Sequence, residues 1–331
     1  MMNLSKTIRT IILASLAATM LASCAAPTFN MEIARPEVSD LKYENKSSES
    51  HSISVLDKRA KESKFSEGTL KFNILIDGKN INEVEELKTA LAAELVNRGS
   101  DVKFTSEGQE NFKLDVVNFK IINHRTNGFT PLITLTQFAG DLWVNGEKQR
   151  IVSFVKRAKV PIWYITEDGI VENTYNQPVS LVVQDLATRI TQRLDNNKIS
   201  DQAIKTLVDE INNDKTDDTT RYFKVYQLGF SNNKSAIPYI INYLDHRDDY
   251  VRLAAISSLG LLDAESEVTR LNKIFTSAKI WQDRAMSLKA LADINTPEAK
   301  AIVDAEWERV SKIAKPDKEA KWNKSILSLY R

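Results

Sequence analysis

Apolar residues recur along the chain with two different periods, and the change of period divides the folded part into two regions. Between residues 67 and 196, short runs alternate with a period near two, as half-buried strands do. These runs lie at 70–76, 112–122, 133–144 and 150–160. From residue 197 to 331 the apolar residues recur with helical spacing. We therefore predict an α+β domain, a mainly antiparallel sheet with two helices, followed by an all-α solenoid.

Local signals place the ends of several elements in the first region. Asn82 is a candidate N-terminal cap for a helix with an apolar stripe, and Gly99 is a plausible C-terminal stop. Pro178 opens a second helix with one apolar face. Asn145-Gly146 is the dipeptide that tight hairpin turns favour. The predicted order is strand, helix, several antiparallel strands, helix.

The second region repeats itself at steps of 31 and 32 residues. An arginine, two apolar residues and a small residue keep their type in three copies: Arg221, Val225, Leu228, Gly229; Arg252, Ile256, Leu259, Gly260; Arg284, Leu288, Leu291, Ala292. The third copy departs by placing Ile280-Trp281 where the others have aspartate pairs. Because one helix pair cannot bury its apolar face, we expect about four pairs to stack into a curved array. A helical bundle with accidental periodicity is the alternative.

Two resemblances rest on these patterns. Residues 250–260 resemble the second helix of a short HEAT-like repeat, which implies a HEAT-like domain over residues 197–331. The element order of residues 67–196 resembles small α/β domains of outer-membrane lipoproteins, including the lipopolysaccharide-assembly type. This second resemblance rests on element order alone, so it carries no binding residue with it.

The first residues have the three parts of a secretory signal: a basic start, an apolar stretch and a small-residue end. Leu21-Ala22-Ser23-Cys24 resembles the lipobox of bacterial lipoproteins. The resemblance implies removal of residues 1–23 as a signal peptide, diacylglycerol on the Cys24 thiol, and a fatty acid such as palmitate on the new amino terminus. An uncleaved membrane helix is the alternative, but the apolar run is shorter than the roughly 20 residues that a span needs.

The residues after Cys24 bear on location. The residue directly after Cys24 is Ala25 and not an aspartate. This resembles the pattern of Gram-negative lipoproteins that are sorted to the outer membrane. Whether the body faces the periplasm or the cell surface stays open. Residues 24–66 are rich in Ser, Glu, Lys and Asn without a sustained apolar period. Such a composition buries too little apolar surface to offset the loss of chain entropy, so we predict a flexible tether.

Composition excludes several kinds of chemistry. With 45 basic against 44 acidic side chains, the chain lacks a basic nucleic-acid footprint, and we expect no nucleic-acid partner. The three histidines lie far apart and Cys24 is the one cysteine, so we expect no metal site and no cofactor. The aspartate pairs at 217–218 and 248–249 could be catalytic or bind Ca²⁺, but helix capping explains them. We expect no catalytic residue and no enzymatic activity.

The sequence patterns allow three functions to be compared. The first is a scaffold or adaptor that binds an envelope protein through the inner face of the array, with Lys224, Gln227 and Ser258 as candidate contacts. The second is an accessory to envelope assembly or transport whose α/β domain binds a lipid, glycan or peptidoglycan-linked partner. An apolar cavity between sheet and helices would support it. A hydrolase ranks last, because no convergent polar set is visible. The oligomeric state is not predicted.

Overall fold

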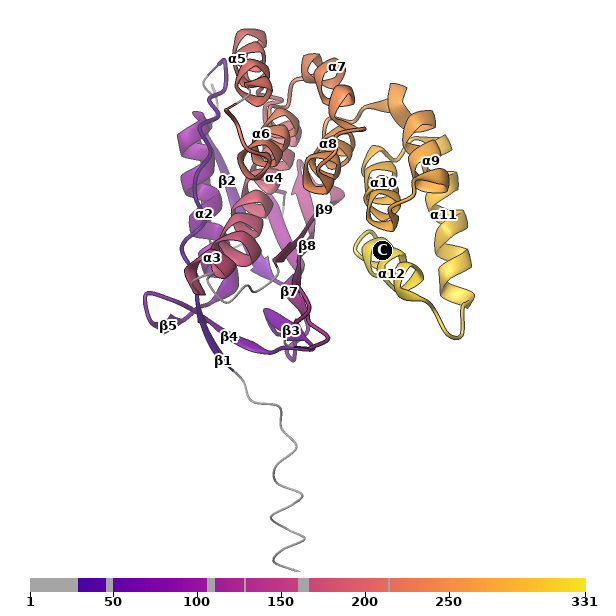
Figure 1. Cartoon of the computed structure of the whole chain (residues 1–331). Coiled ribbons are helices and arrows are strands. Elements are labelled where there is room, and N and C mark those ends of the chain that lie inside the picture. The colour runs from indigo at the N-terminus through magenta and orange to yellow at the C-terminus, as the bar shows by residue number, and fades with distance from the viewer. Residues whose placement is uncertain (1–28, 46–49, 106–110, 128, 160–166, 214) are drawn as a thin grey trace, which may run out of the picture.

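A mixed α/β domain is followed by a helical array that curves around one side of it (Figure 1). The computed structural model describes residues 29–45, 50–105, 111–127, 129–159, 167–213 and 215–331. The predicted fold class, an α+β domain followed by an all-α region, is confirmed.

The main sheet joins parallel and antiparallel strands. Its order is β6-β2-β7-β8-β9, with β2 parallel to both neighbours and β7, β8 and β9 antiparallel. A smaller sheet has the order β1-β4-β5, and β3 extends the main sheet beside the end of β7. The strands are β1 (Phe29–Glu32), β2 (His51–Asp57), β3 (Ser66–Gly68), β4 (Phe72–Ile76), β5 (Lys79–Asn80), β6 (Val102–Thr105), β7 (Lys113–His124), β8 (Leu132–Val144) and β9 (Glu147–Lys159).

The helices fall into two groups. Those of the α/β domain are α2 (Glu83–Arg98), α3 (Glu167–Val171) and α4 (Gln177–Leu194), with a π-helical turn at Glu172–Asn176. Those of the array are α5 (Asp201–Asn212), α6 (Asp218–Phe230), α7 (Ile237–Ile240), α8 (Asp249–Leu261), α9 (Val268–Ser277), α10 (Trp281–Ile294), α11 (Pro297–Lys312) and α12 (Lys318–Ser328). Within the described residues the array therefore comprises four antiparallel pairs, α5/α6 to α11/α12, as the repeat predicts.

The local signals have the expected geometry. Asn82 accepts a hydrogen bond from the Glu85 backbone N–H at 3.2 Å, and Gly99 closes α2 with φ of +92°. Asn145 and Gly146 have φ of +54° and +79°, as a type I′ hairpin turn requires. The helix expected at Pro178 begins one residue earlier, directly after the π-helical turn.

The predicted tether is wrong over most of its length. Residues 29–45 and 50–66 belong to the fold, since they supply β1, β2 and part of β3, and they bury Leu41, Ile53 and Phe65. Their backbone groups pair with strands far along the chain, so packing at a distance supplies the stability that local composition lacks. The α/β domain thus includes the described residues from Phe29 onward and does not begin at residue 67. Cys24 and the remaining tether residues lie outside the described part.

The repeated arginines share one structural role. Each donates to backbone carbonyl oxygens at the end of the preceding helix or in the linker before its own helix: Arg221 to Ile211 and Thr216, Arg252 to His246 and Arg247, and Arg284 to Ala278 and Lys279. Arg252 also pairs with Asp283 at 2.9 Å. Asp283, which stands in the third copy where the second copy has Val251, is therefore the partner of the arginine of the second copy.

The repeated small residues allow neighbouring helices to approach. A Cβ atom added at Gly229 would lie 2.6 Å from the Cβ of Ser258, and one added at Gly260 would lie 2.7 Å from the Cα of Ala290. Both positions therefore have no room for a larger side chain.

Candidate functional site

The inner face of the array packs against the protein's own α/β domain (Figure 1). The Arg157 guanidinium on β9 lies 4.2 Å and 4.1 Å from the ring centroids of Tyr222 on α6 and Tyr250 on α8. Further along β9, the Phe154 ring meets Trp322 on α12 edge-on, with centroids 6.2 Å apart. The array thereby covers the edge strand of the main sheet, which would otherwise offer unpaired backbone groups.

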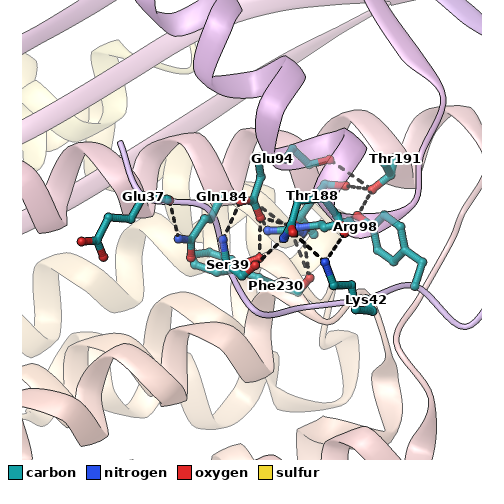
Figure 2. A network of polar contacts seen from close by, with 12 residues as sticks. Glu37, Ser39, Lys42, Glu94, Arg98, Gln184, Thr188, Thr191 and Phe230 are labelled. Carbon is teal, nitrogen blue, oxygen red and sulfur yellow. Dashed lines mark hydrogen bonds and ion pairs between the residues drawn. The ribbon is translucent and has the colours of Figure 1, made fainter. Parts of the chain in front are cut away.

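A second contact joins the two regions through buried charge (Figure 2). The Arg98 side chain on α2 is fully buried and pairs with Glu94 at 2.5 Å. It also donates to Thr188 on α4 at 2.8 Å and to the Phe230 carbonyl oxygen at the end of α6 at 3.3 Å. Burial alone would lower the pKa of Arg98, but Tyr43 and Glu94 outweigh it and raise that pKa.

These contacts make one hydrophobic core. A single cluster of buried side chains extends from Met31 in β1 to Leu329 after α12, with no break at the predicted boundary between residues 196 and 197. That boundary is a change of architecture within one packed body.

The predicted partner-binding residues do not form an accessible face. Gln227 is 7% exposed, and Ser258 is 1% exposed and donates to the Val225 carbonyl oxygen at 3.2 Å. Lys224 is half-buried and pairs with Glu210. The prediction is wrong for Gln227 and Ser258, because a position off the apolar stripe of one helix is still buried when the α/β domain and the next helix cover it.

A polar cleft lies where the array and the α/β domain meet at one end. Helices α4, α6, α8 and α10 all end there, and each is followed within two residues by one with left-handed backbone: Asn196, Asn232, Asp263 and Asn295, with φ between +49° and +52°. The cleft has a volume of about 700 Å³. We call it the junction cleft; its other lining residues are Gln149, Ile151, Arg189, Gln192, Arg193, Lys198, Asn233, Lys234, Gly260, Leu261, Leu262, Asp293 and Ile294.

The wall of the junction cleft is held by hydrogen bonds between the two regions. Gln192 on α4 donates to the Leu261 carbonyl oxygen at the end of α8 at 2.9 Å, and Asn232 donates to the Asn197 carbonyl oxygen at 2.7 Å. On the exposed rim, the Lys234 ammonium lies 3.3 Å from the Asp263 carboxylate. The rim therefore combines side-chain amides, helix-end carbonyls and charged groups.

Behind the cleft lies a buried ionic cluster. The Asp293 carboxylate on α10 contacts Arg189 on α4 at 3.1 Å and Lys289 at 2.7 Å, and it accepts a hydrogen bond from Tyr330 at 2.8 Å. Burial alone would raise the pKa of Asp293, but Arg189 and Lys289 hold it below its ordinary value. The carboxylate therefore stays ionised and connects α4 to α10.

The sequence contains one signal for the row of helix ends that forms this cleft. Asn232, Asp263 and Asn295 are separated by the same steps of 31 and 32 residues as the repeated arginines. Asn and Asp tolerate left-handed backbone better than most residues, so their recurrence marks a row of helix ends. Asn196 lies before the first copy, and only the fold brings it into the row.

Comparison with known proteins bears on the array. Residues 204–292 match the family of HEAT repeats. This match confirms the predicted HEAT-like repeats and covers about a quarter of the chain. No curated protein matches the sequence. A crystal structure titled only as an uncharacterized protein is similar at 11% identity and a TM-score of 0.30, covering 50% of this chain and 99% of its own.

The described residues show neither a membrane-spanning helix nor a metal-binding cluster. None of the helices placed by the structure is both long enough and apolar enough to cross a membrane. In the same part of the chain, His, Cys, Asp and Glu side chains form no group of three or more that is arranged to hold a metal ion.

Proposed function

We propose that this chain is a membrane-anchored, non-enzymatic lipoprotein of the bacterial envelope, held by a lipidated Cys24, and that it binds an extended segment of another envelope protein in the junction cleft. The HEAT repeats support a role as a protein-interaction scaffold. The observation that carries the proposal is the convergence of four helix ends, each with a left-handed Asn or Asp, on one polar cleft. The inner face of the array is covered by β9 and α4, and the cleft is a concavity beside this contact that stays open.

The lining of the cleft suits a peptide. Six side-chain amides line it, and an amide both donates and accepts, as a peptide group of an extended chain requires. Arg189 is already paired with Asp185 and Asp293, so the exposed Lys198 and Lys234 are the cations that an acidic segment would meet. The volume of about 700 Å³ lies within the usual range of ligand sites.

The alternative, lipid binding inside the α/β domain, has less support. The apolar cavity between its sheet and helices, lined by residues such as Ile76, Leu87 and Val183, measures about 20 Å³. That volume holds about one water molecule and no acyl chain. A glycan is the remaining alternative ligand for the junction cleft. Photocrosslinking in cells distinguishes a bound glycan from a bound protein.

The anchor gives a first test. Cys24→Ser removes the thiol that would carry diacylglycerol, so the variant is expected to stay unprocessed and to incorporate no labelled palmitate in growing cells. The unmodified chain should incorporate the label and float with membranes in a density gradient. Labelling of Cys24→Ser at the level of the unmodified chain would contradict the anchor.

The cleft gives a second test. Lys234→Glu reverses a charge on the rim, and it should weaken capture of the partner about tenfold, a cost of about 1.4 kcal/mol. The measurement is the yield of the crosslinked complex from intact cells. Lys273→Glu, on the exposed side of α9, makes the same charge change away from the cleft and should leave the yield unchanged. Equal losses for both variants would contradict a partner site in the cleft.

A further inference from the structure

Two exposed phenylalanines lie at one end of the α/β domain. Phe29, where the described chain begins, is 52% exposed, and Phe129, in the turn from β7 to β8, is 84% exposed. The Phe129 N–H donates to the Asn127 side chain at 2.9 Å, so the turn presents the ring on a defined backbone. A single exposed apolar side chain is common on protein surfaces, so what matters is whether these two share one end of the molecule.

Hydrogen bonds place both phenylalanines on the same end of the molecule. Thr69 links to the β7–β8 turn, since its hydroxyl accepts from the Arg125 N–H at 2.8 Å. The strand that follows Thr69 is β4, whose Phe72 is the register partner of Phe29 in β1. Figure 1 shows β1, β4 and β5 together at this end. We call it the base, formed by β1, β4, β5 and residues 125–127 and 129–131.

The chain between Cys24 and the base is short. Phe29 is the fifth residue after Cys24, so even a fully extended chain separates the two by at most about 18 Å. An acyl anchor on Cys24 therefore keeps the base within that distance of the membrane. Lys79 in the base and Lys71 beside it are exposed, but so is Glu32 of β1, so the contact with lipid depends on the phenylalanines and not on charge.

We infer that the base lies directly on the membrane surface, with the rings of Phe29 and Phe129 in the lipid interface. This inference rests on the proposed anchor at Cys24. Aromatic rings favour the membrane–water interface, and two weak contacts beside a covalent anchor act at high effective concentration. The body is then oriented by the membrane and does not swing on a long tether.

The orientation fixes where the junction cleft lies. Strand β8 runs away from the base, from Leu132 beside the turn to Leu142, which pairs with Gln149 of the cleft. Ten residues of strand span roughly 33 Å. The cleft thus opens far from the membrane, where a partner in the aqueous phase reaches it.

The test uses full-length lipidated protein in vesicles of phosphatidylethanolamine and phosphatidylglycerol that contain a lipid with a doxyl quencher near its headgroup. Phe129→Cys carries a nitrobenzoxadiazole fluorophore, with Cys24 blocked by its lipid. The control is Val96→Cys, which is 67% exposed near the far end of α2. We expect most of the emission to be lost at position 129 and little at position 96.

Other outcomes separate the inference from the anchor on which it rests. Floated protein with equal quenching at both positions, or with none at position 129, overturns the docking and leaves the anchor intact. Protein that stays at the bottom of the flotation gradient overturns the anchor and the docking together. Circular dichroism of both labelled variants confirms that each is folded.

Discussion

Arg98→Met is expected to destabilise the protein by about 3–5 kcal/mol, because it leaves a buried carboxylate without its cation. Glu94 is fully buried, and its remaining partners are the Ser39 N–H and hydroxyl, at 2.7 Å and 2.5 Å. The loss is measured as a shift in the urea unfolding midpoint followed by circular dichroism. Arg98 also holds the end of α6 against α4 (Figure 2), so the array should loosen together with the α/β domain.

Two matched variants separate charge from packing. Adding Glu94→Leu to Arg98→Met removes both charges and should recover a large part of the loss, since a neutral core avoids the unpaired ion. Arg35→Met removes an arginine whose pair with Asp77 lies on the surface, and it should leave the midpoint unchanged. A double variant that is no more stable than Arg98→Met would show that the arginine acts through packing alone.

Leu259→Ala is expected to cost about 2–5 kcal/mol, the usual range for emptying a buried leucine site. Leu259 is fully buried on α8, in the middle of the array and within the core shared with the α/β domain. Chemical unfolding followed by tryptophan fluorescence measures the change. Because the core is continuous, both regions should unfold in one transition.

A matched control again comes from the surface. Val96→Ala shortens an apolar side chain that is 67% exposed, and its effect should stay within about 0.5 kcal/mol. If Leu259→Ala has an equally small effect, the residue does not occupy the core position that the repeat assigns to it.

Signals between neighbours in the sequence predicted the fold well. Asn82 and Gly99 bound α2, Asn145-Gly146 makes the hairpin, and the repeated Arg252 and its equivalents define the array, because each of these depends on residues a few positions away. Pairings over long distances were missed. The polar surroundings of Ile53 suggested a tether, but this residue is buried once β2 pairs with β6 and β7.

The candidate site was missed for a related reason. The sequence shows that α6 and α8 carry apolar stripes, but it does not show which other parts of the protein pack against the remaining faces of these helices. Ser258 is buried by the neighbouring helix, and the Arg157 side chain of β9 occupies the inner face of the array. The junction cleft needs α4 and three repeats at once, so no local pattern could reveal it as a cavity.

Site-specific photocrosslinking in intact cells tests the central claim, a protein partner in the junction cleft, most directly. Benzoylphenylalanine is placed at the exposed Lys198 or Lys234 on the cleft rim, or at Thr276 on the exposed side of α9 as the control. The account predicts the same crosslinked envelope protein from both rim positions, identified by mass spectrometry, and none from Thr276. Crosslinks to that protein from Thr276 alone, or glycan adducts without protein at the rim, would contradict it.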